Sequence, residues 1–234
     1  MNWISQAEIF GVRLTQEQTD QFVQYESLLL EWNQKINLTA VREPSQIQQR
    51  HFLDSLTCVQ VMGDLNGRSV IDVGTGAGFP GLALKIMFPQ MQLTLVESVR
   101  KKTRFLEAVI EALQMSTVSV VVDRAELVGK LPAYREQFDW AVARALADMR
   151  VLVEYLLPLC KVGGKMLAQK GPHAPVELEQ AQRAIQILGG GAATLQPVKL
   201  PAYEDPRYLV VVPKVGLTPE KYPRRVGIPT KRPL

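Results

Sequence analysis

Cysteine and histidine, the residue types that build disulfides and most zinc sites, are scarce: the 234 residues include two of each. Cys58 and Cys160 lie far apart and form no Cys-x-x-Cys pair, so neither a disulfide framework nor a zinc site is indicated, and both are expected in the core. His51 and His173 have no second ligand three or four residues away. We therefore expect no bound metal.

Long apolar runs are also missing. No stretch of 18 or more apolar residues occurs, so no membrane-spanning helix and no membrane partner are expected. The N-terminus, MNWISQAEIF, lacks the basic start and apolar segment of a signal peptide, which predicts a cytoplasmic protein. The content of 47% hydrophobic and 21% charged residues is ordinary for a globular protein. We expect a monomer.

Positive charge gathers at the end of the chain, although the net charge is only +4. The last residues, EKYPRRVGIPTKRPL, place five basic residues among prolines, which should exclude a regular helix. The segment is expected to be a solvated, poorly ordered tail, the usual behaviour of a charge run, or else an arm that contacts phosphates. We treat residues 217–234 as a basic C-terminal tail.

The first part of the chain is helical in pattern. Thr15 followed by Gln18 resembles a capping box. Apolar residues then recur at helical spacing, namely Phe22, Tyr25, Leu28, Leu29, Trp32 and Ile36. A second helical segment is expected over residues 45–61. Residues 1–64 are therefore predicted to form an N-terminal helical cap on a main domain of residues 65–216.

Short apolar runs alternate with helical stretches from Ser69 onward, the pattern of β-α-β units and a parallel sheet. Strands are expected at 69–74, 92–97, 118–123, 138–144 and 164–170, and helices at 82–88, 101–113, 149–160 and 176–188. The last two runs, 193–200 and 207–214, are joined by a loop too short for a crossover helix, so they should pair antiparallel. This is typical of an α/β fold, the Rossmann-like, mostly parallel seven-stranded sheet of class I S-adenosylmethionine (SAM) methyltransferases.

The stretch VIDVGTGAGFPG (residues 70–81) is predicted to form a strand, a glycine loop and the start of a helix. Backbone N–H groups at such a helix start suit a nucleotide-like ligand. Gly76-x-Gly78-x-x-Gly81 also matches the dinucleotide fingerprint, and Glu97 ends the next apolar run, where a ribose-binding acid is expected. The motif alone leaves NAD and SAM open, whereas the C-terminal hairpin favours SAM.

Other strand ends carry further candidates. Asp72 can hold the glycine loop, cap its turn or reach the cationic end of an amino-acid-bearing cofactor. The main-chain N–H of Ala125 and the acid of Glu126 have the chemistry to recognise the acceptor and the amino group of adenine, although a simple helix cap explains these residues equally well. Arg144 suits holding a negative group, but it cannot serve as a base near neutral pH.

No catalytic base or nucleophile can be assigned. The end of the fourth strand, Ala143 to Leu146, contains neither a nucleophilic cysteine nor the Asn/Asp-Pro-Pro-aromatic box typical of exocyclic-amine methylation. Guanine N7 carries an exposed lone pair and needs no deprotonation. Alignment of two reactants can supply on the order of 7 to 11 kcal/mol of the barrier. The expected substrate is then an unstacked base in RNA.

The motifs taken together resemble the RsmG (GidB) family, the bacterial 16S ribosomal RNA guanine-N7 methyltransferases. The resemblance covers nearly the whole chain and rests on Trp32-Asn33-x-x-Ile36-Asn37-Leu38-Thr39, Arg50-His51-Phe52-x-Asp54-Ser55-Leu56, VGTGAGFPG, FDWAVARAL and Gln169-Lys170-Gly171. It implies SAM-dependent methylation of 16S rRNA, either free or in a small-subunit particle. It implies cofactor binding by Gly74, Phe79, Ala125, Glu126 and Arg144, to which the residue pattern adds Gly76 and Glu97.

Two other functions stay open on the sequence. The glycine spacing fits a nicotinamide-binding oxidoreductase, although the chain has no room for a substrate domain. The basic tail fits a non-catalytic RNA-binding protein that keeps a nucleotide pocket. Lys170 and His173, near the end of the fifth strand, are either RNA contacts or part of an ordinary surface loop.

Overall fold

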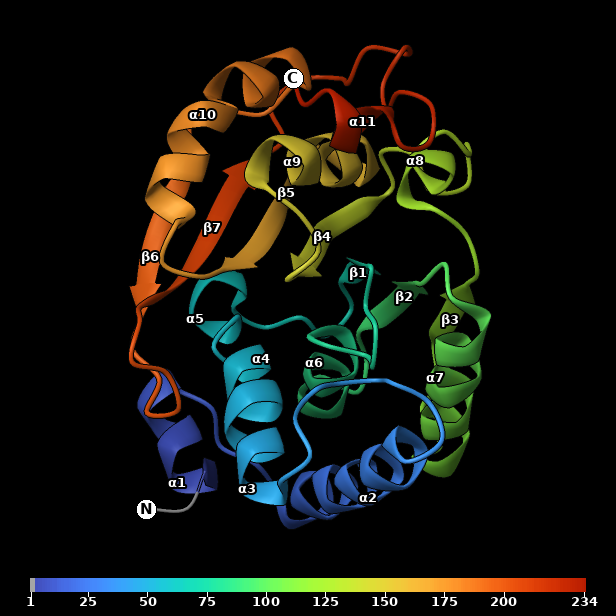
Figure 1. The fold of residues 1–234 in the computed structure, drawn as a ribbon, viewed down its shortest axis with the longest axis vertical. Helices are drawn as coiled ribbons and strands as arrows, with labels where there is room; N and C mark the ends of the chain where they lie inside the picture. The colour runs from blue at the N-terminus through green and yellow to red at the C-terminus, as the bar shows by residue number, and fades with distance from the viewer. Residues whose placement is uncertain (1–2) are drawn as a thin grey trace.

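A seven-stranded sheet forms the centre of the computed structural model, which describes residues 3–234. The strands lie in the order β3-β2-β1-β4-β5-β7-β6, and helices cover both faces (Figure 1). The first five strands are parallel to one another. Their bounds are β1 Ser69–Val73, β2 Gln92–Val96, β3 Val118–Val121, β4 Phe138–Arg144 and β5 Cys160–Lys170.

The last two strands, β6 (Thr194–Val198) and β7 (Arg207–Pro213), pair antiparallel with each other, as predicted. β7 also pairs antiparallel with β5, so it lies between β5 and β6 in the sheet. The connection between β6 and β7 contains no helix. A hairpin is the pairing that such a short connection permits.

Five helices follow strands β1 to β5 and cover the sheet. Their bounds are α6 Gly81–Met87, α7 Arg100–Ala112, α8 Ala125–Val128, α9 Met149–Leu156 (followed by a 3₁₀ turn, Leu157–Leu159) and α10 Ala174–Ile187. Alternate residues of β1 serve two cores, since Val70 packs with α6 and α7 whereas Ile71 packs with α9 and α10. The two helical layers therefore lie on opposite faces of the sheet (Figure 1).

The N-terminal part is helical, as expected. Thr15 and Gln18 form the predicted capping box, with hydrogen bonds of 3.2 and 2.9 Å, at the start of α2. The second predicted helical segment is a run of short turns that includes one π-helical stretch. The elements are α1 Trp3–Ala7, a 3₁₀ turn Glu8–Phe10, α2 Gln16–Asn33, α3 Pro44–Ile47, the π-helical Gln48–Leu53, α4 Asp54–Leu56 and α5 Val59–Met62. Phe22 and Tyr25 of α2 join the core that contains α6 and α7.

The C-terminal segment (residues 217–234) packs against α8 and α9 (Figure 1). The expectation of a solvated, poorly ordered tail is wrong, because Tyr222 is buried and Arg224 pairs with the fully buried Glu154. The expectation that prolines exclude a helix is also wrong, because α11 (Ile228–Lys231) carries Pro229 in its first turn. Proline is tolerated there since first-turn N–H groups have no partner within the helix. Across residues 3–234, no helix is both long and apolar enough to cross a bilayer.

Candidate functional site

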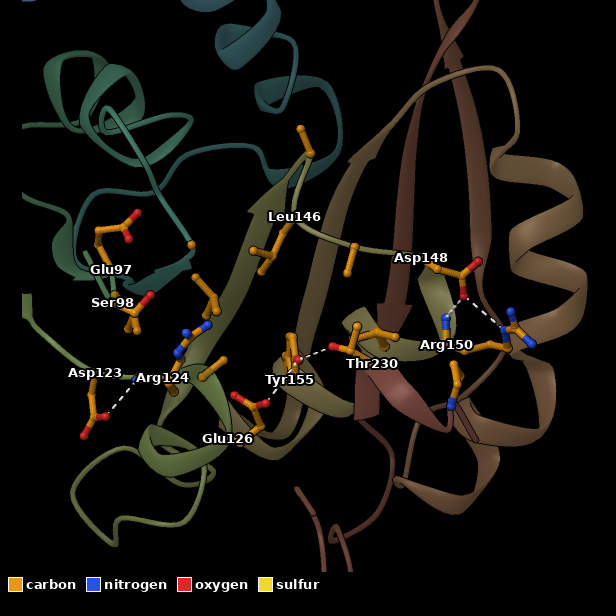
Figure 2. A pocket seen from close by; sticks show the side chains of 18 of the residues that line it. Glu97, Ser98, Asp123, Arg124, Glu126, Leu146, Asp148, Arg150, Tyr155 and Thr230 are labelled. Carbon is orange, nitrogen blue, oxygen red and sulfur yellow. Dashed lines mark hydrogen bonds and ion pairs between the residues drawn. The ribbon is translucent and has the colours of Figure 1, made fainter. Parts of the chain in front are cut away.

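A cavity of about 690 Å³ opens beside the carboxyl ends of β1, β2, β3 and β4 (Figure 2). The order of the strands reverses between β1 and β4, and such a switch point is where open α/β sheets bind ligands. The volume lies within the range of roughly 300 to 1,000 Å³ typical of small-molecule sites. Four of the predicted cofactor residues line the cavity: Gly74, Glu97, Ala125 and Glu126.

Asp72 holds the glycine loop in place. Its Oδ2 accepts hydrogen bonds from the Thr75 hydroxyl at 2.7 Å and from the Gly81 N–H at 2.8 Å. Burial raises the pKa of Asp72 to about 6, although these two hydrogen bonds act in the opposite direction. The side chain is fully buried and does not line the cavity. This geometry supports the loop-holding role and not direct contact with a ligand.

Gly74 lies where the backbone passes close to the loop that follows β4. Its φ is +67°, and an added Cβ would lie 2.6 Å from Cδ1 of Leu146. Ala145 places Leu146 there by adopting a φ of +52°, which is uncommon for a residue with a side chain and is often found at functional sites. The positive φ therefore favours glycine at position 74, and a Cβ there would displace the exposed Leu146 side chain.

Glu97 comes directly after β2 and lines the cavity with a carboxylate that the backbone orients. Its Oε2 accepts the Gly76 N–H at 3.1 Å, and its Oε1 accepts the Val99 N–H at 2.8 Å. Gly76 does not line the cavity itself, so its contribution is to position Glu97. Each carboxylate oxygen retains acceptor capacity. Two neighbouring hydroxyl groups, as on a ribose, match this arrangement.

Ala125 and Glu126 form the first turn of α8 and line the opposite part of the cavity. Among the described residues no side chain caps α8, although Glu126 does stand in its first turn, where an acid is favourable, so the alternative role at the helix start is met in part. Oε1 of Glu126 accepts hydrogen bonds from the Tyr155 hydroxyl at 3.2 Å and from the Gly227 N–H at 2.9 Å. Among residues 3–234, no hydrogen bond to the other oxygen, Oε2, is present, and it remains an acceptor for a ligand.

Phe79 and Arg144 lie outside the lining of this cavity. The Phe79 ring stacks on His51 at 4.8 Å and on Tyr25 at 5.3 Å between ring centroids, and the guanidinium of Arg144 lies 5.0 Å from its centre. Nη1 of Arg144 also pairs with Asp54 at 3.1 Å. The structure thus brings Phe79 and Arg144 together, but apart from the cavity lined by Glu97.

These two residues belong to a group that we call the arginine–aromatic cluster, which consists of Arg50, His51, Asp54, Phe79, Arg144, Tyr203 and Arg207. Asp54, only 2% exposed, is the one carboxylate among three guanidinium groups, and Arg207 approaches it to 3.4 Å. The Tyr203 ring lies 5.4 Å from the Arg50 guanidinium and 4.9 Å from that of Arg207. The Nε atoms of both arginines are buried without a hydrogen-bond partner.

His51 is an uncharged member of this cluster. Burial, followed by the positive charge of Arg144, lowers the pKa of His51 to about 3. Its Nε2 lies 2.8 Å from the hydroxyl of Thr39, and its Nδ1 lies 3.2 Å from Nη2 of Arg144. Nδ1 also lies 3.1 Å from the carbonyl oxygen of Arg50, so this nitrogen faces a donor, the guanidinium, and an acceptor, the carbonyl.

Sequence reasoning missed several residues of the cavity. Tyr155 comes from α9, whereas Thr230 and Pro233 come from the C-terminal segment. Their positions carry no motif, and Thr230 stands among basic residues and prolines. Lys170, a suggested RNA contact, instead pairs with Glu177 at 2.6 Å and donates to the Ala147 carbonyl at 2.8 Å, which ties β5 to the loop after β4.

The model of the family described as rRNA small subunit methyltransferase G matches residues 18–202. The chain is 49% identical to ribosomal RNA small subunit methyltransferase G of Roseiflexus castenholzii over 97% of both chains. It is 48% identical to the protein of the same name from Pelotomaculum thermopropionicum, over 97% of this chain and 95% of that one.

The fold is similar to that of precorrin-6y C5,15-methyltransferase from Geobacter metallireducens, with a TM-score of 0.51. That similarity covers 76% of this chain and 91% of the other, at 14% identity. At this identity it bears on the fold alone, and it confirms the predicted class I methyltransferase architecture.

Proposed function

The chain belongs to the rRNA small subunit methyltransferase G family, and from this we propose that it transfers the methyl group of SAM to N7 of a guanine in 16S ribosomal RNA. The observation that carries the proposal is the 49% identity to a family member over 97% of both chains. The cavity at the switch point of the sheet is the matching structural feature.

The polar groups around the cavity fit SAM. Glu97, oriented by two backbone N–H groups, is proposed to accept hydrogen bonds from the ribose hydroxyls. Glu126 keeps one oxygen for the adenine amino group, and Gly74 leaves the backbone accessible. When bound, SAM supplies a methyl group activated by its sulfonium. Phe79 and Arg144, also assigned to cofactor binding on family resemblance, are proposed to support the loop and strand that carry Gly74 and Ala145.

The protein's own contribution to the reaction is to hold and align the two reactants. Guanine N7 presents its lone pair without losing a proton, so the site requires no general base. The role of the cavity residues is therefore proposed to be orientation, whose contribution can reach on the order of 7 to 11 kcal/mol. No residue is assigned as a catalytic acid or base.

The proposed partner is 16S rRNA, free or within a small-subunit particle, and the protein is proposed to act as a monomer in the cytoplasm. The family match supports an RNA substrate. The arginine–aromatic cluster adjoins the cavity along the chain, because Arg144 directly precedes Ala145, which lines the cavity.

The test supplies methyl-labelled SAM with either 16S rRNA or small-subunit particles that lack the modification. Aniline cleavage after borohydride reduction then maps N7-methylguanine, because the chemistry cuts the chain at that base. We expect one labelled guanine with the wild-type protein and none with Glu97→Ala at the same SAM concentration. Label on an exocyclic nitrogen, or no label in either substrate, would contradict the proposal.

The glycine spacing also fits a nicotinamide-binding oxidoreductase, the second candidate, and ligand-dependent melting separates the two. A ligand that binds the native state stabilises it by mass action. We expect SAM and S-adenosylhomocysteine to raise the melting temperature, and NAD to leave it unchanged. The reverse result would favour the oxidoreductase.

A further inference from the structure

The C-terminal segment supplies part of the wall of the cavity. Thr230 and Pro233 line it, together with residues that follow β1, β2, β3 and β4. Figure 2 shows Thr230 next to Tyr155, and Tyr155 next to Glu126. The match to the family model ends at residue 202. This part of the wall therefore comes from outside the region that the family model describes.

The segment is anchored before it reaches the cavity. Glu154 of α9 is fully buried and accepts four hydrogen bonds from Arg224: from the backbone N–H at 2.8 Å, from Nε at 2.9 and 3.1 Å, and from Nη2 at 2.6 Å. The guanidinium of Arg135 donates to the carbonyls of Thr218 and Tyr222, at 2.7 and 2.8 Å. A bidentate ion pair between an arginine and a buried carboxylate is strong and has a specific geometry.

Beyond this anchor, the segment holds Glu126. The Gly227 N–H donates to Oε1 of Glu126 at 2.9 Å, and the Tyr155 hydroxyl donates to the same oxygen at 3.2 Å. The hydroxyls of Tyr155 and Thr230 lie 3.2 Å apart. These contacts fix the orientation of the carboxylate and leave Oε2 as the oxygen that a ligand can use.

We propose that the C-terminal segment is part of the SAM-binding site, where Thr230 and Pro233 close one side of the cavity and Gly227 holds Glu126 in position for the amino group of adenine. The inference rests on the proposed function, because it assigns a role within the same cofactor site. Tyr155 and Thr230 are positioning residues here, and Glu126 is the residue that contacts the ligand. Exposed Lys231 and Arg232 lie in the same segment but do not line the cavity.

The first experiment measures binding of S-adenosylhomocysteine by titration calorimetry. A chain truncated after Val226 keeps the Arg224–Glu154 anchor and loses the donor to Glu126 as well as Thr230 and Pro233. We expect its affinity to fall about tenfold or more, the effect of losing one charged hydrogen bond and part of the enclosure. Unchanged affinity overturns the inference, whereas a full-length protein that fails to bind the compound overturns the proposed function itself.

Point variants keep the test valid if the truncated chain does not fold. Thr230→Val removes the hydroxyl at nearly constant volume, and we expect weaker binding of S-adenosylhomocysteine by about threefold, as for loss of one neutral hydrogen bond. Thr230→Ser should restore wild-type affinity because it keeps the hydroxyl. Lys231→Ala is the matched control on the same helix and should bind as the wild type does. Equal affinities for Thr230→Val and the wild type count against the inference.

A second ligand separates positioning of Glu126 from simple enclosure. S-inosylhomocysteine carries an oxygen in place of the adenine amino group, so its position 6 presents an acceptor to Glu126 where adenine presents a donor. The full chain should prefer the adenine compound, and truncation after Val226 should remove most of that preference. Equal losses for both ligands would refute the role through Glu126. Loss of rRNA affinity with unchanged affinity for both ligands would instead assign the segment to RNA contact.

Discussion

The cavity and the arginine–aromatic cluster meet at the end of β4, where Arg144 belongs to the cluster and Ala145 lines the cavity, yet they are built from different contacts. The cavity is lined by backbone and by carboxylates, such as those of Glu97 and Glu126, that keep unused acceptors. The cluster is filled by rings and by a buried ion pair, and Asp54 is almost fully enclosed. An arrangement with open acceptors is suited to binding a ligand, whereas a filled and paired arrangement contributes mainly to stability.

The predicted cofactor residues therefore fall into two groups. Gly74, Glu97, Ala125 and Glu126 line the cavity, whereas Phe79 and Arg144 belong to the cluster. Substitutions in the first group should change ligand affinity more than folding. Substitutions in the second should change folding more than affinity, because the cluster joins the N-terminal helical part to the sheet.

Asp54→Ala should give the largest effect. It removes the one carboxylate among three arginines and leaves buried cations without their partner. Removing one partner of a buried ion pair costs about 3 to 5 kcal/mol. Urea denaturation measures this loss in the free energy of unfolding. Asp64→Ala, on an exposed acid, is the control and should cost below about 1 kcal/mol; a similarly small loss for Asp54→Ala would show that the cluster is not what stabilises this junction.

Glu97→Ala should weaken ligand binding strongly and destabilise the fold only slightly, the reverse of what is expected for Asp54→Ala. Loss of a charged acceptor for two hydroxyls should weaken S-adenosylhomocysteine binding by about 100-fold, or about 2.7 kcal/mol. The free energy of unfolding should fall by only about 1 kcal/mol, since the freed N–H groups of Gly76 and Val99 can bind water instead. Calorimetric titration and urea denaturation of one preparation give both values. Glu107→Ala, on the exposed face of α7, should change neither; a stability loss above that of Asp54→Ala would reverse the assignment.

Much of the fold follows from local patterns. β4 has the predicted bounds, 138–144, because its run of apolar and small residues is flanked by polar residues and turns. The hairpin followed from the shortness of one loop. The start of β5 was predicted less well. The strand begins at Cys160 and not at residue 164. Gly163 and Gly164 made the preceding residues look like a turn, whereas Cys160 in fact pairs with Phe138, the first residue of β4. Glycines usually indicate a turn, but pairing with neighbouring strands can override that preference.

The residues of the site also divide into those that local sequence patterns predict and those that they do not. Gly74, Glu97 and Glu126 could be predicted because each follows a strand, and the carboxyl ends of parallel strands meet at one edge of a sheet. Thr230 and Tyr155 could not, since 75 residues separate them in sequence. The burial of Arg224 was equally hidden, because composition alone does not reveal the buried partner Glu154. Contacts between distant segments depend on the folded structure and leave no periodic signal.

Titration of His51 offers a finer test of the cluster. Its pKa is lowered to about 3 in the folded protein, against 6.5 as the usual value. The unfolded chain thus binds a proton that the native state does not bind, and stability present above pH 6.5 is lost as the pH falls. Between pH 7 and pH 5 the loss should be about 2 kcal/mol, at about 1.4 kcal/mol per pH unit. Urea denaturation of the wild type and of His51→Gln at both values measures it, and equal pH dependence of the two proteins would contradict the prediction.

Asp72 supports the glycine loop of the cavity. Its effect on the pH dependence of stability should be opposite in sign to that of His51 and smaller. Because burial raises its pKa from 3.8 to about 6, the native state binds the extra proton, so its contribution to stability is present at low pH and is lost as the pH rises through 6. Acidification from pH 7 to pH 5 should therefore stabilise the wild type by about 1 kcal/mol relative to Asp72→Asn. Asparagine keeps an acceptor for Thr75 and Gly81 and removes only the titration. If the difference between the two proteins has the same sign as that for His51→Gln, then Asp72 is not a buried acid with a raised pKa, and its place in the glycine loop has to be reassessed.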